Sequence, residues 1–450
     1  MKKIDRVTLV QAPWLTVTNA PNIGLAYIAA VLRRADYTVS VIDLNVETSL
    51  LLDADDKKIV GYTSWDYIKK FTENTFLKYK PVYDKAVRRI LDTEPEAVGF
   101  SVWESNDILS RYFAEELKRH RPGLKIIFGG PACYPLYQGH ELILHDYIDY
   151  VIYGEAEISV LKVLEAMSSG RETTDIPGTI KRKNGISVDC GQGERPERLD
   201  ELPFSALDLL PLSLYQSKSL PISFNRGCIY KCEYCELAGM KPGFRARSAR
   251  NIFNELLQRK QEFPDKNDFF VCDCAITAHP SQISELCDLI IASGIRTEFS
   301  GYATFHPLLS DELIVKMEKA GFMAVVLGVE SGSDKILGMM GKKFNREAIE
   351  RTIHSFHAAR IMVGVNILVG LPGETENDFE QSIDFLAKNR KFIKNIGACY
   401  FGQMPYSAIY YHPEKYEFVP EDVKRRRYNR LKEFISQSQL YYTAEDKPAK

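Results

Sequence analysis

The chain has 450 residues, of which 45% are hydrophobic and 26% charged, and its formal net charge is −2. These proportions are ordinary for a globular protein of two or three domains. They give no basic field that would attract nucleic acid, and no apolar run reaches the length of a membrane span. The first residues are charged where a signal peptide needs an apolar run, and nine scattered cysteines suit a reducing compartment, so we expect a cytoplasmic protein.

The first 165 residues alternate between two patterns. Short apolar runs bounded by turn residues predict strands at 7–10, 39–42, 97–100, 125–128 and 150–153. Apolar residues with helical spacing lie between them, for example Leu25, Ile28, Ala29 and Leu32. This alternation predicts a doubly wound parallel sheet, interrupted at 47–95 by a mostly helical insertion.

Ligands of such sheets bind outside the carboxyl ends of the strands. Ser101, Gly129, Gly130 and Gly154 stand at these ends, so we expect them near a ligand. Gly129 and Gly130 allow a ligand to approach the backbone closely, and they are equally compatible with a simple strand-to-loop turn.

The remaining chain divides into three parts. Residues 166–214 are predicted to be a linker with a turn at 183–185, and 411–450 a helical C-terminal segment and tail. Between them, 215–410 again alternate strand and helix, which fits an open (β/α)6 partial barrel with strands at 222–224, 269–272, 297–299, 325–329, 363–368 and 397–400. The basic run 424–427 is interpreted as a solvated helix face.

Three cysteines follow the first barrel strand, where a barrel carries its chemistry. Cys228, Cys232 and Cys235 can fold one short loop around a single soft metal centre. A closed iron–sulfur cluster takes four thiolates, so three leave one iron open for a ligand that is not protein. A structural zinc site would need a fourth Cys or His, and the nearest histidine in sequence is His279. Zinc and inert core cysteines remain the alternatives.

The loop, with Tyr234 before its last cysteine, resembles the signature of the radical S-adenosylmethionine (SAM) superfamily. The resemblance implies that Cys228, Cys232 and Cys235 hold a [4Fe–4S] cluster whose open iron is chelated by SAM. It implies that an electron, from an external donor such as flavodoxin or ferredoxin, breaks a carbon–sulfur bond of SAM to give a 5′-deoxyadenosyl radical. It also places Tyr234 near the adenine.

Later segments of the barrel strengthen this resemblance. Residues 328–334, 368–374 and 405–407 are similar to segments that end the fourth, fifth and sixth barrel strands of the family. The similarity implies that Glu330, Ser331 and Asn366 contact SAM. No further catalytic residue is assigned.

The N-terminal segments 21–28, 41–43, 128–131 and 153–155 resemble the cobalamin-binding domain that precedes the barrel in many radical SAM proteins. The resemblance implies cobalamin near Ser101, Gly129, Gly130 and Gly154. The DxHxxG motif that supplies a histidine to cobalt in some cobalamin proteins is absent, so we expect cobalt free of protein histidine. The alternative is a domain that has lost its cofactor.

Four further residues have two interpretations each. Cys272 and Cys274 flank Asp273 after the second barrel strand. We expect both cysteines to pack in the core, and the alternative is a Cys274 that faces the site. Arg245 and Arg247 suit a ligand carboxylate or acidic residues of the next helix equally.

The leading hypothesis is a cobalamin-dependent radical SAM enzyme that methylates carbon in a small molecule, lipid or pigment precursor. A second hypothesis keeps the radical but replaces methyl transfer by cyclisation or rearrangement. A third is a sensor that binds zinc or cobalamin. A methylthiotransferase is disfavoured, because that resemblance calls for three more cluster cysteines in the N-terminal domain, where only Cys133 lies.

Overall fold

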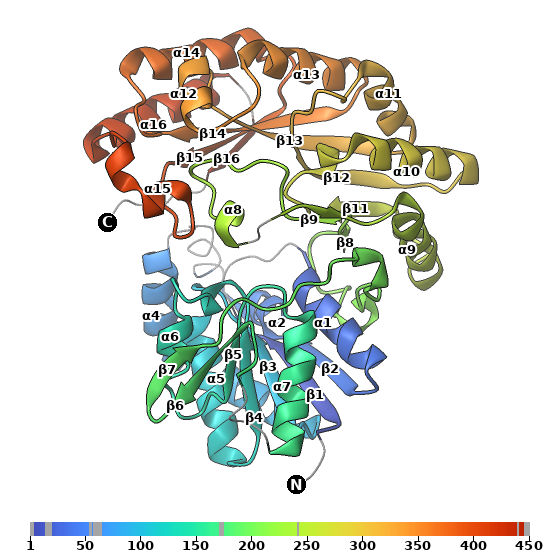
Figure 1. The fold of residues 1–450 in the computed structure, drawn as a ribbon, viewed down its shortest axis with the longest axis vertical. Helices are drawn as coiled ribbons and strands as arrows, with labels where there is room; N and C mark the ends of the chain where they lie inside the picture. Colours follow the sequence, from blue (N-terminus) through green and yellow to red (C-terminus); the bar gives the residue numbers. More distant parts are fainter. Residues whose placement is uncertain are drawn as a thin grey trace. The chain divides into compact units, whose positions relative to one another are not determined.

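The computed structural model describes residues 4–13, 20–53, 56, 65–170, 175–240, 243–438 and 441–444 (Figure 1). The chain divides into two compact units, Met1–Lys218 and Ser219–Lys450. Each unit has its own sheet, and each is described by itself.

The first unit contains a seven-stranded sheet in the order β2-β1-β3-β4-β5-β6-β7. Its first five strands are parallel and confirm the predicted runs: β1 (Arg6–Gln11), β2 (Thr38–Asp43), β3 (Ala97–Ser101), β4 (Lys125–Gly129) and β5 (Tyr150–Ile152). Because the chain builds outward from β1 in both directions, the order reverses between β1 and β3. A ligand crevice is expected at that point, outside the carboxyl ends of the strands.

Helices follow the strands of this sheet: α1 (Ile23–Arg34), α2 (Leu44–Leu51), α4 (Trp65–Asp92), α5 (Asp107–His120), α6 (Gly139–Leu142) and α7 (Glu157–Ser169). The Asn22 side chain caps α1 by accepting from the amide of Leu25, which starts the helix two residues before the predicted apolar stripe. Buried side chains of α1 and α7 pack together on β1, β4 and β5 and form the core of that face. The predicted insertion at 47–95 is helical where it is described, and 54–55 and 57–64 lie outside the described residues.

The predicted linker differs from expectation, because much of it belongs to the first unit. Strands β6 (Thr179–Lys183) and β7 (Ile186–Asp189) form an antiparallel hairpin on the edge of β5. Asn184 and Gly185 join them with φ of 52° and 79°, the two positive values that a tight hairpin turn requires. Further along, the Tyr215 hydroxyl donates to Asp43 Oδ2 at 2.5 Å, and Arg33 pairs with Asp208 at 2.7 Å. The edge strand needs partners for its backbone, and the connector supplies them.

The second unit contains a parallel sheet in the order β16-β15-β14-β13-β12-β11-β8. Its strands are β8 (Leu220–Ile222), β11 (Asp268–Val271), β12 (Glu298–Ala303), β13 (Phe322–Glu330), β14 (Met362–Val369), β15 (Asn395–Tyr400) and β16 (Tyr441–Ala444). The six predicted strands are confirmed, although the first begins and ends two residues earlier than predicted. The residues that follow it form β9 (Asn225–Arg226), which pairs with β10 (Arg245–Ala246) outside this sheet. The seventh strand, β16, was not predicted. Since β8 and β16 are the edges, the described sheet is open, as a partial barrel requires.

The helices of this unit lie mostly on one face of its sheet (Figure 1). They are α8 (Leu237–Met240), α9 (Ala249–Glu262), α10 (Pro280–Ser293), α11 (Asp311–Lys319), α12 (Asp334–Met339), α13 (Arg346–Ala358), α14 (Glu376–Asn389), α15 (Ala408–Tyr411) and α16 (Glu421–Gln437). Along β14, Val363, Val365 and Ile367 are buried on the covered face, whereas Asn366 and Leu368 of the other face are partly accessible. Among the helices that the structure describes, none is both long enough and apolar enough to cross a membrane.

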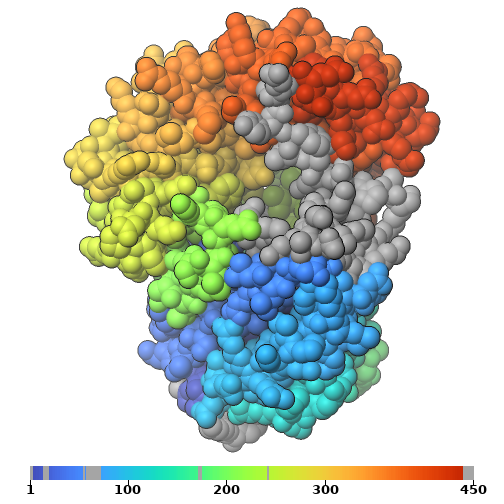
Figure 2. Space-filling view, turned by 180° about the vertical axis from the view of Figure 1, so that it is seen from behind, coloured from blue at the N-terminus to red at the C-terminus, as the bar shows by residue number. Residues whose placement is uncertain are grey.

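Only two of the four residues in the basic run 424–427 of α16 are exposed to solvent. Arg425 and Arg426 are exposed, and α16 lies at the surface of its unit (Figure 2). Arg427 is buried and pairs with Glu374 at 3.0 Å, while the Lys424 stem packs against Gly370. The prediction is therefore wrong for Lys424 and Arg427. A helix with this many charged residues must still pack one face against the rest of its unit. Long basic side chains can form that face where they meet buried acidic partners.

Candidate cofactor sites

The cysteine loop runs from β9 to α8 at the carboxyl end of the barrel sheet, and its three cysteines are partly buried. Burial raises the pKa of Cys235 to about 11, and the nearby thiols of Cys232 and Cys228 add to the shift, so the three sulfurs lie within electrostatic range of one another. In the described part of the chain, no three His, Cys, Asp or Glu side chains are already close enough to hold a metal ion. The fit to a cluster rests on the donor chemistry, which is three soft thiols on one loop.

The entry and the interior of this loop are held by other segments of the second unit. The Asp273 carboxylate accepts the backbone amides of Phe224 and Asn225 at 3.0 Å each, just before the loop begins. Within the loop, the Glu233 amide donates to the Met340 carbonyl at 3.1 Å, and the Tyr416 hydroxyl donates to Glu233 at 2.9 Å. The loop is thereby fixed from three elements far apart in sequence.

Asp273 is therefore a positioning residue whose side chain lies inside the unit. Burial raises its pKa to about 7, and the hydrogen bonds that it accepts oppose that shift. Cys272 and Cys274 on either side are exposed, so the expectation that they pack in the core is wrong. The bend that turns Asp273 inward turns both neighbours outward.

Arg247 pairs with Glu255 of α9 at 2.6 Å, and both side chains are almost fully buried. The alternative of acidic partners on the next helix is confirmed for Arg247. Its guanidinium also donates to the Ser223 carbonyl at 2.7 Å, so it supports the same entry to the cysteine loop as Asp273.

Tyr234 and Glu330 meet directly. The Tyr234 hydroxyl donates to Glu330 Oε1 at 3.0 Å, and the Tyr234 ring packs on an apolar cluster that includes Ile336 and Leu371. Burial, with the Glu330 charge, raises the pKa of Tyr234 far above its usual range, so the phenol stays neutral and can donate. Glu330 has φ of 68°, the left-handed region, at the end of β13. A glutamate there costs about 1–3 kcal/mol, a kind of strain that clusters at functional sites.

The position of the Glu330 carboxylate depends on a glycine. A Cβ on Gly328 would lie 2.7 Å from Glu330 Oε1, so the carboxylate folds back over Gly328, on the face opposite the main helix layer. In the sheet register, Gly328 pairs with Asn366 of β14. The structure thus gathers three of the four residues predicted for SAM, namely Tyr234, Glu330 and Asn366, at the carboxyl ends of two neighbouring strands.

The fourth predicted residue, Ser331, points elsewhere. Its side chain is fully buried, lies 3.3 Å from the hydroxyl of Ser382 in α14 and accepts the Ser333 amide at 3.1 Å. We therefore correct the expectation, because the turn after Glu330 sends Ser331 into the helix layer. Sequence reasoning also missed Lys342, whose ammonium lies 3.5 Å from Glu330 Oε1. A lysine in a loop carries no pattern that indicates burial.

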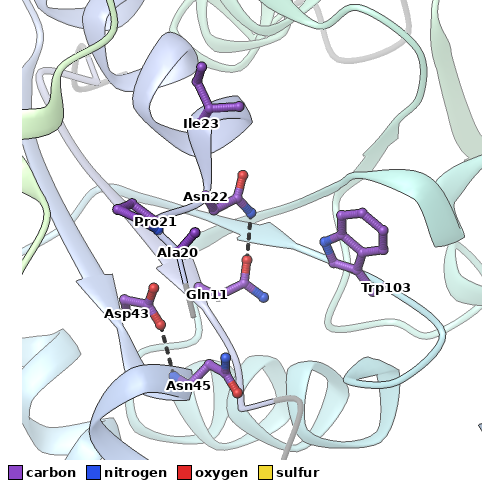
Figure 3. Close-up of a pocket in the computed structure, with 8 residues that line it drawn as sticks. All are labelled: Gln11, Ala20, Pro21, Asn22, Ile23, Asp43, Asn45 and Trp103. Carbon is purple, nitrogen blue, oxygen red and sulfur yellow. Dashed lines mark hydrogen bonds between the residues drawn. The ribbon is translucent and has the colours of Figure 1, made fainter. Parts of the chain in front are cut away.

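The first unit has a pocket at the carboxyl ends of β1, β2 and β3 (Figure 3). Asn22 Nδ2 donates to Gln11 Oε1 at 2.7 Å and to Ser101 Oγ at 3.0 Å. The Asp43 carboxylate accepts the amide of Asn45 at 3.0 Å and caps α2. The pocket coincides with the point where the strand order reverses. Its walls combine amide side chains, a carboxylate and an indole with apolar side chains: Gln11, Ala20, Pro21, Asn22, Ile23, Asp43, Asn45 and Trp103.

The residues predicted for cobalamin stand differently around this pocket. Ser101 contacts it through Asn22. Gly130 has φ of 114°, and a Cβ there would lie 2.6 Å from the Val102 carbonyl oxygen. The local turn therefore requires glycine at this position. Gly129 and Gly154 have ordinary space around them and do not line the pocket. Gln11 and Asp43 were not assigned as cobalamin contacts, although both stand at strand ends, where the ligands of such sheets bind.

Comparison with known proteins gives both units a family. The model of the radical SAM superfamily matches residues 222–386, and that of the B12 binding domain matches residues 16–164. An uncharacterized methyltransferase of Pyrococcus horikoshii, PH0819, is 24% identical over 399 residues, which cover 86% of this chain and 78% of that protein.

Solved structures share the fold over nearly the whole chain. The cobalamin-dependent SAM radical enzyme OxsB, with aqua-cobalamin and SAM bound, aligns with a TM-score of 0.68 at 17% identity, covering 96% of this chain and 56% of its own. The radical SAM methyltransferase TsrM from Kitasatospora setae aligns with a TM-score of 0.67 at 19% identity, covering 90% and 75%. This chain therefore spans little more than half the length of OxsB.

The two matched domains agree with the three-thiol loop in the second unit and with the strand-end pocket in the first. The chain therefore joins a B12 binding domain to a radical SAM domain, which makes it a radical SAM enzyme, and the cofactors of these two domains are cobalamin, S-adenosylmethionine and a [4Fe–4S] cluster.

Proposed function

We propose that this enzyme transfers a methyl group from SAM to a carbon atom of a small-molecule substrate, with an external protein such as flavodoxin or ferredoxin as electron donor. The observation that carries the proposal is the presence, in one chain, of the three-thiol loop beside Tyr234 and Glu330 and of the pocket at the strand ends of a B12 binding domain. Two demanding cofactors imply two tasks, which are hydrogen abstraction and methyl delivery.

The names of similar proteins favour methyl transfer over rearrangement. PH0819 and TsrM are both called methyltransferases, and this chain covers 78% and 75% of their lengths. The substrates of those two proteins are not assigned to this chain. We propose only that its substrate is a small molecule, a lipid or a pigment precursor.

When bound, the cofactors supply an adenosyl radical that removes a hydrogen atom and a methyl group that replaces it. The residues of this chain bind and orient them. Cys228, Cys232 and Cys235 hold the cluster. Tyr234, Glu330 and Asn366 contact the nucleoside of SAM, since a fixed carboxylate, a phenol and an amide suit ribose hydroxyls and a base. The strand-end pocket that contains Asn22 and Asp43 holds cobalamin.

The pocket is compatible with cobalamin whose cobalt has no protein histidine. None of its eight described lining residues is a histidine. Its amide and carboxylate groups suit the amide side chains at the rim of the corrin ring, because each can donate or accept hydrogen bonds there.

We expect label from methyl-labelled SAM to appear on product only when cobalamin is supplied. The full chain, loaded with iron–sulfide and cobalamin under anaerobic conditions, is supplied with a chemical reductant. With substrate, 5′-deoxyadenosine and S-adenosylhomocysteine should form in comparable amounts with labelled product. A metal analysis on the same sample separates iron with sulfide from zinc alone.

Two results would contradict the proposal. Formation of 5′-deoxyadenosine with a rearranged, unlabelled product would replace methyl transfer by the cyclisation or rearrangement hypothesis. Activity that is indifferent to cobalamin would make the first unit a domain that has lost its cofactor.

A further inference from the structure

Lys342 is buried beside the proposed SAM site, which is unusual for a lysine. It lies in the loop between α12 and α13, next to Gly341, and its side chain is only 7% exposed. A buried ammonium is costly unless it is paired and hydrogen-bonded, so its partners indicate what it does.

Those partners are the groups of the site itself. Lys342 Nζ donates to the Gly328 carbonyl at 3.1 Å and lies 3.5 Å from Glu330 Oε1. It also lies 5.5 Å from the ring centres of Tyr234 and Phe344, a distance at which an ammonium is attracted by an aromatic face. One cation therefore contacts the strand end, the carboxylate and the aromatic residue of the cysteine loop.

Glu330 needs such a partner. Its backbone is in the left-handed region, and its carboxylate is folded over Gly328, where no side chain stands beneath it. Tyr234 gives it one hydrogen bond, and a neutral phenol does not compensate its charge. Without a cation, a carboxylate that is only 11% exposed would be driven to turn toward solvent, because a buried charge is costly unless it is paired.

We propose that Lys342 is a positioning residue of the SAM site, which holds the Glu330 carboxylate fixed over Gly328 so that it accepts hydrogen bonds from the nucleoside of SAM. This inference rests on the proposed function, since it takes Glu330 as a SAM contact. Preorganisation of this kind strengthens binding, because the acceptor is already in place when the ligand arrives.

SAM affinity of the full, cluster-loaded chain tests the proposal, measured by equilibrium dialysis. We expect Lys342→Met to weaken SAM binding by roughly ten- to a hundredfold, since one partner of a buried charged pair is removed. Lys342→Arg, which keeps the charge, should recover most of the loss. Lys343→Met is the matched control, because Lys343 is the next residue and is exposed. It should leave the affinity within about twofold of wild type, as surface substitutions do.

A double-mutant cycle separates positioning from general stabilisation. If Lys342 acts through Glu330, Lys342→Met should add little to the loss already caused by Glu330→Gln. Fully additive losses would overturn the proposal, as would wild-type affinity in Lys342→Met. If Lys342→Met does not fold, Lys342→Gln, which donates without charge, takes its place with the same expectations. If the wild-type chain does not bind SAM, the proposed function and this inference both fail. If the wild-type chain binds SAM and the Lys342 variants bind it equally well, the inference alone fails.

Discussion

Replacing Cys228, Cys232 or Cys235 by alanine should abolish both the iron–sulfur cluster and the cleavage of SAM. Three thiolates are the fewest that leave a [4Fe–4S] cluster with a single open iron, so each loss removes a ligand that no neighbour replaces. In the described residues, no other group of metal-binding side chains is close enough to take over. Iron and sulfide content, visible absorption and 5′-deoxyadenosine formation measure the effect.

The control for these variants is Cys190→Ala. Cys190 is also partly buried, and it lies in the first unit, outside the loop. It should keep full iron content and wild-type SAM cleavage. Retained cluster and retained cleavage in any one of the three loop variants would remove that cysteine from the ligand set and the cluster assignment with it.

Replacing Arg427 by methionine should cost about 3–5 kcal/mol of unfolding free energy, the usual effect of leaving a buried charge without its partner. Arg427 and Glu374 are 5% and 1% exposed in their side chains and lie 3.0 Å apart. Glu374 Oε2 also accepts the Gly370 amide at 2.9 Å, so the pair ties α16 to the loop that follows β14. Urea unfolding of the full chain, followed in the second unit, measures the loss.

The cost of this substitution should grow with pH. Burial raises the pKa of Glu374 to about 7, above its unfolded value near 4.5, and Arg427 opposes that rise. A folded pKa above the unfolded one means that stability is complete below about 4.5 and declines as pH rises through the folded pKa. Without Arg427 the folded pKa is higher still, so the deficit of Arg427→Met should be small at pH 5 and large at pH 8.

Two further variants isolate the buried pair. Arg427→Met with Glu374→Gln leaves no buried charge and should recover most of the stability and lose the pH dependence. Arg430→Met removes a partner of Glu376 and Glu380 that is 41% exposed, and should cost about 1 kcal/mol or less. A pH-independent deficit in Arg427→Met would show that lost packing, rather than the Glu374 charge, accounts for its effect.

Much of this protein could be predicted from local pattern. Short apolar runs between turn residues marked the five parallel strands of the first sheet and six of the second, because a parallel sheet buried on both faces needs continuous apolar segments. The spacing of Cys228, Cys232 and Cys235 indicated one metal centre, since ligands on one short loop meet without help from the rest of the chain. Both are properties of neighbours in sequence.

Tertiary structure alone decided which distant residues meet. The connector completes the first sheet because β5 offers an edge, and Lys424 and Arg427 turn inward because Glu374 and Gly370 lie beneath α16. Asp273 binds the backbone before the cysteine loop, and Lys342 reaches Glu330 through a loop closed by two helices. Local periodicity predicts whether a side chain is buried. Only register and helix packing determine which charge it is buried against, and at the SAM site that partner defines the chemistry.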